Sequence, residues 1–312
     1  GTRAGALPGK SLVVFDPALG IALDVFPCED GHAQERSLLS AVADTVHEAD
    51  LWVMDRNFCV LGWLFRIHQQ SAFFVVRQHS NTPYKPLKPL ELIGKSTTGD
   101  LYEQPVEMTA PSGEKIQVRR VVVKLKKPTR NGETFIVLLT NLPREIDTLI
   151  IAELYRHRWK IETAFQKLES HLNSELNTLG YPRAALFGFC LALVAFNIYA
   201  IVMAALRATH RDQAINETVS EYYIAQEIAT NTGGMLIAVP PVEWVMFAEA
   251  SLVELGSMLL NIATHVDLKK YKKHPRGPKK PPMEKTQFRG HPHVSTAKLI
   301  KASAKARAAN RA

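Results

Sequence analysis

Cysteine is scarce in this sequence: Cys28, Cys59 and Cys190 are the only three among its 312 residues. They are far apart and odd in number, and no two of them form a Cys-x-x-Cys pair. This pattern argues against a disulfide framework and against a cysteine-based zinc site. The opening GTRAGALPGK has neither a methionine nor the apolar segment of a signal peptide. We therefore expect a fragment of a cytoplasmic protein.

Charge is absent from one long stretch, Ala184–Leu206, whose 23 residues include no Asp, Glu, Lys or Arg. A helix of that length is long enough to span a bilayer. However, Asn197 lies near the middle of the stretch, and the sequence has no second stretch of this kind. A helix that is apolar on all sides is also what a large domain buries at its centre. We favour the buried helix and keep the membrane helix as an alternative.

Acidic residues are nearly absent from the end of the chain. Residues 269–312 contain 14 Lys and Arg but one acid, Glu284, whereas residues 1–268 contain 24 basic and 29 acidic residues. The segment LKKYKKHPRGPKKPP is rich in Lys and Pro and has no apolar period, which predicts a basic disordered tail over residues 268–312. Such a tail favours nucleic acid, although a solvated tail with no partner stays open.

What is present fits a globular protein of mixed structure. With 46% hydrophobic residues, the chain can bury a large core, as one domain with additions or as two domains. Over residues 1–78 the apolar patterns predict a β-hairpin, a helix, a strand, a second helix and a further strand. These segments are residues 11–16 with 20–26, then 35–50, 51–55, 59–70 and 72–78.

The region that follows has a different pattern. Residues 79–140 contain strand-like runs separated by the turn-forming clusters PSGE and PTRNGE, which predicts an antiparallel β meander. Helical composition returns over residues 141–206, where Asp147 is a plausible N-cap, and continues through residues 207–267. The sequence therefore predicts an α/β fold with a β-rich insertion and a helical C-terminal region.

One carboxylate, Glu162, stands among basic and aromatic residues in the stretch YRHRWKIETAFQKLES. If this stretch is a helix, spacings of three and four place Tyr155, Arg158 and Glu162 on one face. Such a face is most often a solvated i,i+4 ion pair, here between Arg158 and Glu162. Trp159 lies about 100° away around the helix, where core packing is favoured over stacking on a base.

A second acid, Asp55, stands at the carboxyl end of the apolar strand in LWVMDRNF. Such strand ends commonly face the ligand crevice of an open α/β sheet. A strand-end Asp and a helix-borne Glu are the hard oxygen ligands that hold pairs of Mg²⁺ ions in phosphoryl-transfer sites. An Asp-Arg pair after a strand is also common as an ion pair in a surface turn, so both interpretations stay open at this point.

Together these motifs resemble the DDE transposases of bacterial insertion sequences, and most closely the insertion-sequence-four family, over about residues 8–205. The signature of that family is Tyr, two residues, Arg, three residues, Glu, six residues, Lys, and Tyr155, Arg158 and Glu162 match it in type and spacing. DRNF at Asp55 resembles the family's second aspartate motif, and PGKSLVVFDP with EDGHAQERSLL resembles the segment before it.

The resemblance implies an RNase H-like catalytic fold in which a β-rich insertion separates the second aspartate from the glutamate. It implies that Asp55 and Glu162 are catalytic and bind two divalent ions, Mg²⁺ or alternatively Mn²⁺, for cleavage at transposon ends and strand transfer. It also implies that Tyr155 and Arg158 contact the DNA backbone. The expected partners are terminal inverted repeats, target DNA and a second copy in a homodimer, without a membrane, at the bacterial nucleoid.

Two departures from the family pattern bear on activity. The signature lysine falls at Glu169, so Lys160 or Lys167 would have to make its DNA contact. The first catalytic aspartate has no counterpart, because Asp16 and Asp24 lie in the predicted hairpin and not on the opening strand of the sheet. With that first strand missing, SLVVFD and LWVMD would have unpaired edges. We expect this chain to be inactive alone, with a DNA-binding remnant that lacks catalysis as the alternative.

Overall fold

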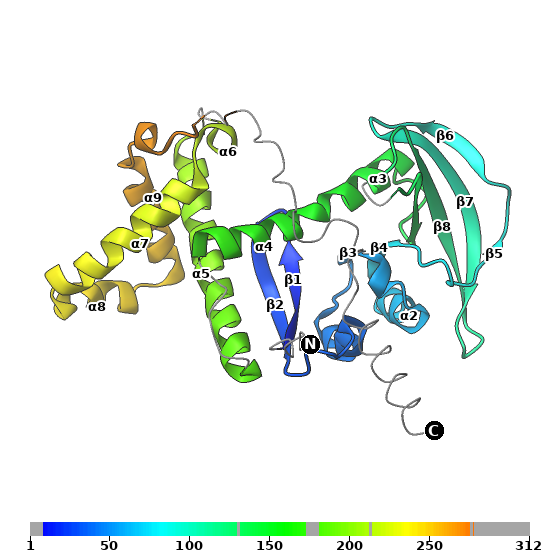
Figure 1. The fold of residues 1–312 in the computed structure, drawn as a ribbon, viewed down its shortest axis with the longest axis horizontal. Coiled ribbons are helices and arrows are strands. Elements are labelled where there is room, and N and C mark those ends of the chain that lie inside the picture. Colours follow the sequence, from blue (N-terminus) through cyan, green and yellow to red (C-terminus); the bar gives the residue numbers. More distant parts are fainter. Residues whose placement is uncertain (1–8, 130–131, 173–180, 212–213, 275–276, 278–312) are drawn as a thin grey trace, which may run out of the picture.

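The computed structural model describes residues 9–129, 132–172, 181–211, 214–274 and 277, and for residues 167–172 it describes the backbone alone. Most strands lie at one end of the molecule and most helices at the other, and a helical rod connects the two ends (Figure 1). This mixture of strands and helices confirms the predicted α/β class.

The main sheet has seven strands in the order β3-β4-β9-β8-β7-β5, with β6 paired to β7. β3 and β4 are parallel, and the other pairs are antiparallel. β9 returns beside β4, so the predicted meander exists and continues the sheet that begins with β3. The strands are β3 (Leu51–Met54), β4 (Phe73–Arg77), β5 (Lys85–Pro86), β6 (Glu91–Lys95), β7 (Gly99–Thr109), β8 (Lys115–Leu125) and β9 (Phe135–Thr140).

The largest buried cluster lies between this sheet and α2 (Leu61–Gln69), the second helix predicted from the sequence. Leu64 and Ile67 of α2 are completely buried together with Phe74 and Val76 of β4. Burial of each such side chain stabilises the fold by about 1.5–3 kcal/mol. The strand that precedes α2, β3, is thereby held at a fixed place beside β4.

The first two strands, β1 (Lys10–Asp16) and β2 (Ile21–Cys28), form an antiparallel hairpin, as predicted. The hairpin is a two-stranded sheet of its own and does not continue the main sheet. Gly20 adopts a φ of 75° in the turn and donates its N–H to the carbonyl of Asp16 at 2.8 Å. The Asp16 carboxylate accepts the N–H groups of Ala18 and Leu19 at 2.7 and 3.0 Å. This acid therefore stabilises the turn.

The helix predicted over residues 35–50 is short and irregular. It consists of η1 (Glu35–Leu38), α1 (Leu39–Val42) and η2 (Ala43–Thr45). Val46 is already extended, Ala49 has a φ of 66°, and the Asp50 carboxylate accepts the N–H of His47 at 2.8 Å. Because such local side-chain bonds compete with helix formation, the prediction is wrong for residues 46–50.

The segment after β9 folds as two helices, α3 (Thr148–His157) and α4 (Trp159–Leu172), where a continuous helix was predicted. The predicted cap is confirmed, because the Asp147 carboxylate accepts the N–H of Leu149 at 2.8 Å. At the junction, Arg158 N–H bonds the carbonyl of Tyr155, and Ile161 N–H bonds the carbonyl of Arg158. These bonds reach three residues back, and this tightening of the 3₁₀ type separates the helices at Arg158.

A buried ion pair anchors the start of α3 to the sheet. Arg119 of β8 donates two hydrogen bonds of 2.8 Å to Glu103 of β7, and one of 2.7 Å to each of the carbonyls of Pro143 and Ile146. Burial raises the pKa of Glu103, but the bonds from Arg119 and Thr148 outweigh burial and hold this pKa below its usual value. The central strands therefore set where α3 begins.

The C-terminal helices gather around α5. Tyr199, Met203 and Leu206 of α5 share a buried cluster with Ile224 of α7 and Ala263 of α9. The elements are α5 (Pro182–Thr209), α6 (Ile215–Thr218), α7 (Glu221–Ala238), α8 (Pro241–Glu249), α9 (Leu252–Thr264) and the turn η4 (Leu268–Tyr271).

The start of the predicted basic tail is attached to these helices. Lys272 pairs with Val219 in an isolated β-bridge, and the N–H of Lys273 donates to the carbonyl of Thr218 at 2.8 Å. Residues 268–274 therefore lie beside the end of α6, and the prediction of a disordered tail is wrong for them. The disorder predicted for residues 278–312 lies outside the described residues.

α5 is long and apolar enough to cross a membrane by length and composition. Its Asn197, however, bonds the main chain of Ala22 in β2 in both directions: Oδ1 accepts at 2.9 Å and Nδ2 donates at 2.7 Å. Leu193 and Phe196 pack against the same hairpin. One face of α5 is therefore buried as predicted. The opposite face is exposed, and for that face the prediction of a buried helix is wrong.

Candidate catalytic site

Asp55 directly follows β3, which ends at Met54, one residue before the end predicted from the sequence. Its carbonyl accepts the N–H of Phe58 at 3.0 Å, which starts the turn η3 (Arg56–Phe58). The residue is half-buried. Its carboxylate therefore lies at the edge of the sheet where the chain leaves β3, with Arg56 as its neighbour in the sequence.

Tyr155 of α3 contacts Asp55 and so joins α3 to the end of β3. Its phenol donates to Asp55 Oδ1 over 3.4 Å, which is a long and weak hydrogen bond. The side chain is buried, with 5% of the residue exposed. Burial raises the pKa of Tyr155, the positive charge of Arg158 lowers it, and the negative charge of Asp55 raises it, with a net increase. The phenol therefore stays protonated and acts as a donor to Asp55.

Arg158, at the junction of the two helices, connects Tyr155 to Glu162. Its guanidinium lies 5.8 Å from the centre of the Tyr155 ring, and its Nη2 is 3.0 Å from Glu162 Oε1. The Arg158 side chain is 16% exposed, whereas that of Glu162 is 40% exposed. The site is thus a continuous series of contacts from Asp55 through Tyr155 and Arg158 to Glu162.

The helix break changes the predicted geometry of this series. Tyr155 belongs to α3, Glu162 belongs to α4, and Arg158 lies between the two helices. The spacing predicted that the three side chains share one face of one regular helix, and this prediction is wrong. The i,i+4 ion pair of Arg158 and Glu162 nevertheless forms, because the backbone of Arg158 keeps right-handed helical angles (φ −50°, ψ −34°).

Trp159 is not a core residue, contrary to the prediction. It is 59% exposed, and the guanidinium of Arg158 lies 5.1 Å from its ring centre. A cation over an indole face is a favourable contact of about 0.5–1 kcal/mol at an exposed site. Arg158 therefore lies between two aromatic rings, with Tyr155 on the buried side and Trp159 on the exposed side.

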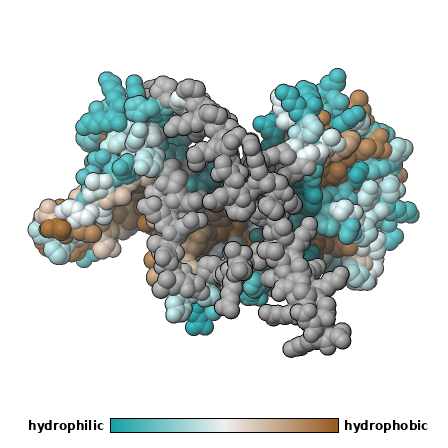
Figure 2. Space-filling model, viewed as in Figure 1, coloured by the Kyte–Doolittle hydropathy of each residue, from teal (hydrophilic) through white to brown (hydrophobic). Residues whose placement is uncertain are grey.

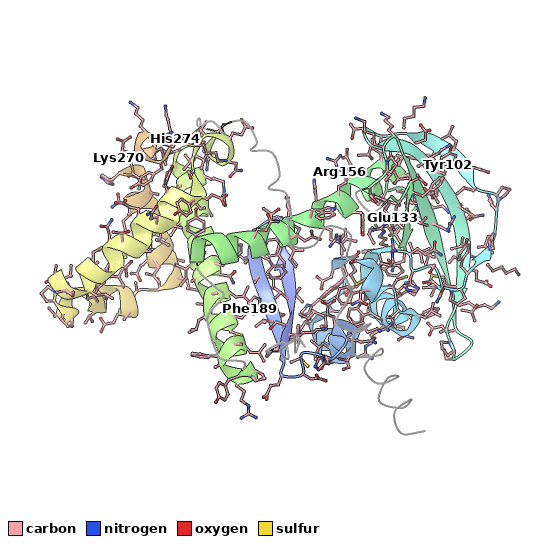
Figure 3. The ribbon with its side chains drawn as sticks, in the orientation of Figure 1. Tyr102, Glu133, Arg156, Phe189, Lys270 and His274 are labelled. Carbon is pink, nitrogen blue, oxygen red and sulfur yellow. The ribbon has the colours of Figure 1, made fainter. Side chains whose placement is uncertain are left out.

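Glu133, which no sequence pattern indicated, lies close to the site. Its carboxylate binds both Arg56, the residue after Asp55, and Arg77 at the end of β4. Figure 3 shows Glu133 where the strands approach α3, near the labelled Arg156. Two cations close to the site are thereby paired with one acid from the chain between β8 and β9.

Of the two lysines predicted to contact DNA, the structure describes the side chain of Lys160. Lys160 is exposed and donates to the carbonyl of Pro17 in the β1–β2 turn at 3.2 Å. The side chains of Lys167 and Glu169 lie outside the described residues, so the prediction for the signature lysine position is left as it stands.

Comparison with known proteins adds to this geometry. A family model described as the transposase DDE domain matches residues 9–198. The chain belongs to this family. A protein of Sinorhizobium fredii (strain NBRC 101917 / NGR234), named "Putative transposase y4zB", is 28% identical over 215 residues. The match covers 64% of this chain and 57% of that protein, so the chain spans less than two thirds of its relative.

All four contact residues lie inside the matched transposase DDE domain. Domains of this family are nucleases and strand transferases that generally bind DNA and generally use divalent metal ions. The carboxylates of Asp55 and Glu162 are the oxygen donors that Mg²⁺ prefers. Among the described residues, no group of three or more His, Cys, Asp or Glu side chains could hold a metal ion. In chemistry the two carboxylates suit Mg²⁺, which often keeps water and phosphate oxygens among its ligands.

Proposed function

We propose that this chain is the catalytic part of a transposase that uses divalent metal ions to cleave DNA at transposon ends and to transfer the strands to target DNA. The observation that carries the proposal is the series of contacts that runs from Asp55 through Tyr155 and Arg158 to Glu162. Two acids that are far apart in the sequence and lie on different elements are thereby linked through one phenol and one guanidinium.

In this proposal Asp55 and Glu162 hold Mg²⁺, with Mn²⁺ as a substitute, and two ions are bound. When bound, the ions would supply Lewis-acid chemistry for the attacking water and the leaving oxygen. Tyr155 orients the Asp55 carboxylate, because the protonated phenol donates to one of its oxygens. Arg158 holds Glu162 at the other end of the site.

Arg158 and Tyr155, with Lys160 and Lys167, form the proposed DNA contact. The permanent charge and planar donor fork of a guanidinium suit a phosphate. The proposed DNA partners are terminal inverted repeats and target DNA, bound by a homodimer at the nucleoid in the bacterial cytoplasm.

We infer further that the chain belongs to the insertion-sequence-four subgroup and is catalytically inactive alone. The subgroup rests on the spacing of Tyr155, Arg158 and Glu162. The inactivity rests on the third carboxylate, which the described residues do not supply, and on Glu169 at the signature lysine position. A carboxylate there repels the phosphate that a lysine would attract.

A DNA-binding remnant without catalysis is the second candidate, favoured by the same two departures. It would keep salt-sensitive DNA binding through Arg158 and the basic residues, because phosphate neutralisation needs no metal. The two candidates differ in one measurable property: a metal site at Asp55 and Glu162 belongs to the first candidate alone.

The deciding experiment measures Mn²⁺ binding to the purified chain by electron paramagnetic resonance, with and without a DNA duplex. We expect Asp55→Asn and Glu162→Gln each to weaken Mn²⁺ binding at least tenfold, about 1.4 kcal/mol. The matched controls Asp24→Asn and Glu153→Gln remove exposed acids of β2 and α3 and should bind Mn²⁺ as the wild type does. Equal Mn²⁺ binding by the wild type and the four variants would contradict the metal site and would favour the DNA-binding remnant.

A second assay tests the inferred inactivity. The chain is incubated with a terminal-repeat duplex and target DNA in Mg²⁺ or Mn²⁺, and cleaved and joined strands are resolved on a gel. We expect no strand transfer from the chain alone. Robust transfer that Asp55→Asn abolishes would contradict the inactivity and would support the metal site.

A further inference from the structure

The outer face of α5 carries a row of exposed apolar side chains. Exposure is 66% for Phe187, 53% for Leu191, 57% for Val194, 58% for Ile198 and 51% for Ile201. The opposite face of the helix is occupied, since Leu193 and Phe196 pack against the β1–β2 hairpin. Large exposed apolar patches on a folded protein mark interaction sites. This row, residues 187, 191, 194, 198 and 201, is called the α5 seam below.

The spacing of the α5 seam indicates what covers it. Successive members are four, three, four and three residues apart, which is the a/d repeat of a helix that pairs with another helix. The seam is about 21 Å long at 1.5 Å per residue. A partner helix of similar length would cover it entirely, whereas DNA offers no apolar surface of this shape.

The charge pattern narrows the choice of partner. The stretch Ala184–Leu206 has no charged residue, so the partner must also present a long uncharged helix face. Among the helices that the structure describes, α7, α8 and α9 each contain glutamates, and α8 and α9 are also shorter than the seam requires. α5 itself is the helix that fulfils both conditions, which points to the α5 of a second copy.

The surface of the other C-terminal helices is also apolar, but it has no comparable repeat. Ile237 and Val242, where α7 meets α8, are 89% and 70% exposed, and Figure 2 shows apolar side chains at that end of the molecule. Their positions form no 4-3-4-3 row. The α5 seam therefore indicates a specific partner by its spacing, whereas the surface where α7 meets α8 does not.

We propose that two copies of the chain associate through antiparallel pairing of their α5 seams. Reversing the 4-3-4-3 spacing gives 3-4-3-4, so a two-fold axis matches the two seams when it lies midway between Leu191 and Val194. Phe187 then packs beside Ile198 of the second copy, and Leu191 packs beside Val194. This pairing names an interface for the homodimer of the proposed function, and rests on that part of it alone.

Antiparallel pairing agrees with two further features. The helix dipoles of the two α5 helices oppose each other, which favours antiparallel neighbours. The hairpins that Asn197 attaches to α5 lie on the far side of each helix, so they leave the seam accessible. The same attachment argues against a membrane around α5, because a bilayer would also have to accommodate β2.

The first experiment measures the mass of the purified chain by sedimentation equilibrium, without DNA or metal. We expect a dimer whose dissociation constant rises at least tenfold, about 1.4 kcal/mol, in Leu191→Glu and in Val194→Glu. Both side chains are exposed in one copy, so circular dichroism should show an unchanged fold. Leu92→Glu introduces the same charge at a residue of β6 that is 59% exposed and should leave the dimer intact.

The second experiment tests the antiparallel arrangement by oxidative cross-linking, in a chain whose three native cysteines are replaced by serine. Phe187→Cys and Ile198→Cys should form a covalent dimer when the two variants are mixed, and little when each is alone. Cross-linking of residue 187 only to itself would overturn the antiparallel pairing.

Three outcomes would overturn the interface. A wild-type chain that stays monomeric at every concentration tested has no such dimer. A dimer that persists in Leu191→Glu and Val194→Glu associates elsewhere. Binding of α5 to lipid vesicles, with no self-association, would mean that the seam serves a membrane. Because neither metal nor DNA is present, failure of the metal site would not affect these measurements.

Discussion

The carboxylate of Glu133 binds the guanidinium of Arg56, the residue that follows Asp55. It also binds Arg77, which ends β4 next to β3. The hydrogen bonds from Arg56 and Arg77 hold the pKa of Glu133 below its usual value, and the bond to Glu133 raises the pKa of Arg56. The chain between β8 and β9 is thereby connected to β4 and to the turn that begins at Asp55.

Glu133→Gln should destabilise the protein at neutral pH, because Arg56 and Arg77 lose their common anion. A carboxylate with a lowered pKa contributes stability above the pKa of the unfolded chain, about 4.3, and this contribution is lost as pH falls through the folded pKa. The difference between wild type and variant should therefore shrink below about pH 4.3. Urea unfolding at several pH values measures this difference. Glu107→Gln removes a surface partner of Lys115 and serves as control. An equal pH dependence for both variants would contradict the assigned role.

Arg119→Ala should be strongly destabilising, by about 3–5 kcal/mol, because it leaves Glu103 buried without its cation. It also removes the donors to Pro143 and Ile146 that fix the start of α3. Chemical denaturation gives the change in unfolding free energy. Lys115→Ala in the exposed pair with Glu107 should cost no more than about 1 kcal/mol. A small effect of Arg119→Ala would mean that α3 is anchored by other contacts.

Asn197→Ala should destabilise the protein by about 1–3 kcal/mol, since the N–H and carbonyl of Ala22 both lose their partner. The loss should appear in thermal or urea unfolding and in faster hydrogen exchange at β2. Asn231→Ala on α7 removes an exposed side-chain bond to Glu227 and should change the stability little. If the two variants are equally stable, the attachment of α5 to the hairpin contributes no stability.

Arg158→Ala should weaken DNA binding and reduce the slope of log affinity against log salt by about one. Arg158→Lys keeps the charge but loses the planar fork, so it should keep the slope and lose affinity. Fluorescence anisotropy with a labelled duplex at several salt concentrations measures both quantities. Arg183→Ala removes an exposed arginine that pairs with Glu29 and serves as control. Equal slopes for wild type and Arg158→Ala would show that Arg158 contacts no phosphate.

Several features could be predicted from the sequence because they depend on neighbouring residues. The hairpin turn needs a glycine with a positive φ, and Gly20 supplies it. The start of α3 needs a cap, and Asp147 supplies it. The position of Asp55 followed from the apolar strand before it. Each of these signals is complete within a few residues, so no knowledge of the tertiary structure was required.

Other features depend on contacts between distant segments. Glu133 pairs with Arg56 and Arg77, which are 77 and 56 residues away, and no pattern in the sequence near Glu133 predicts these pairs. The residues around Arg158 are ordinary helix formers, yet the helix breaks there, between the part that contacts β4 and the part that contacts α5.

The break at Arg158 also divides the candidate site between two parts of the molecule. Asp55 and Tyr155 stand with the main sheet, whereas Glu162 stands on α4, which packs against α5. Arg158 thus links the two acids and is also the point at which the chain passes from one packed part to the other. The relative position of the two carboxylates therefore depends on the backbone at this one residue, in addition to the packing of each part.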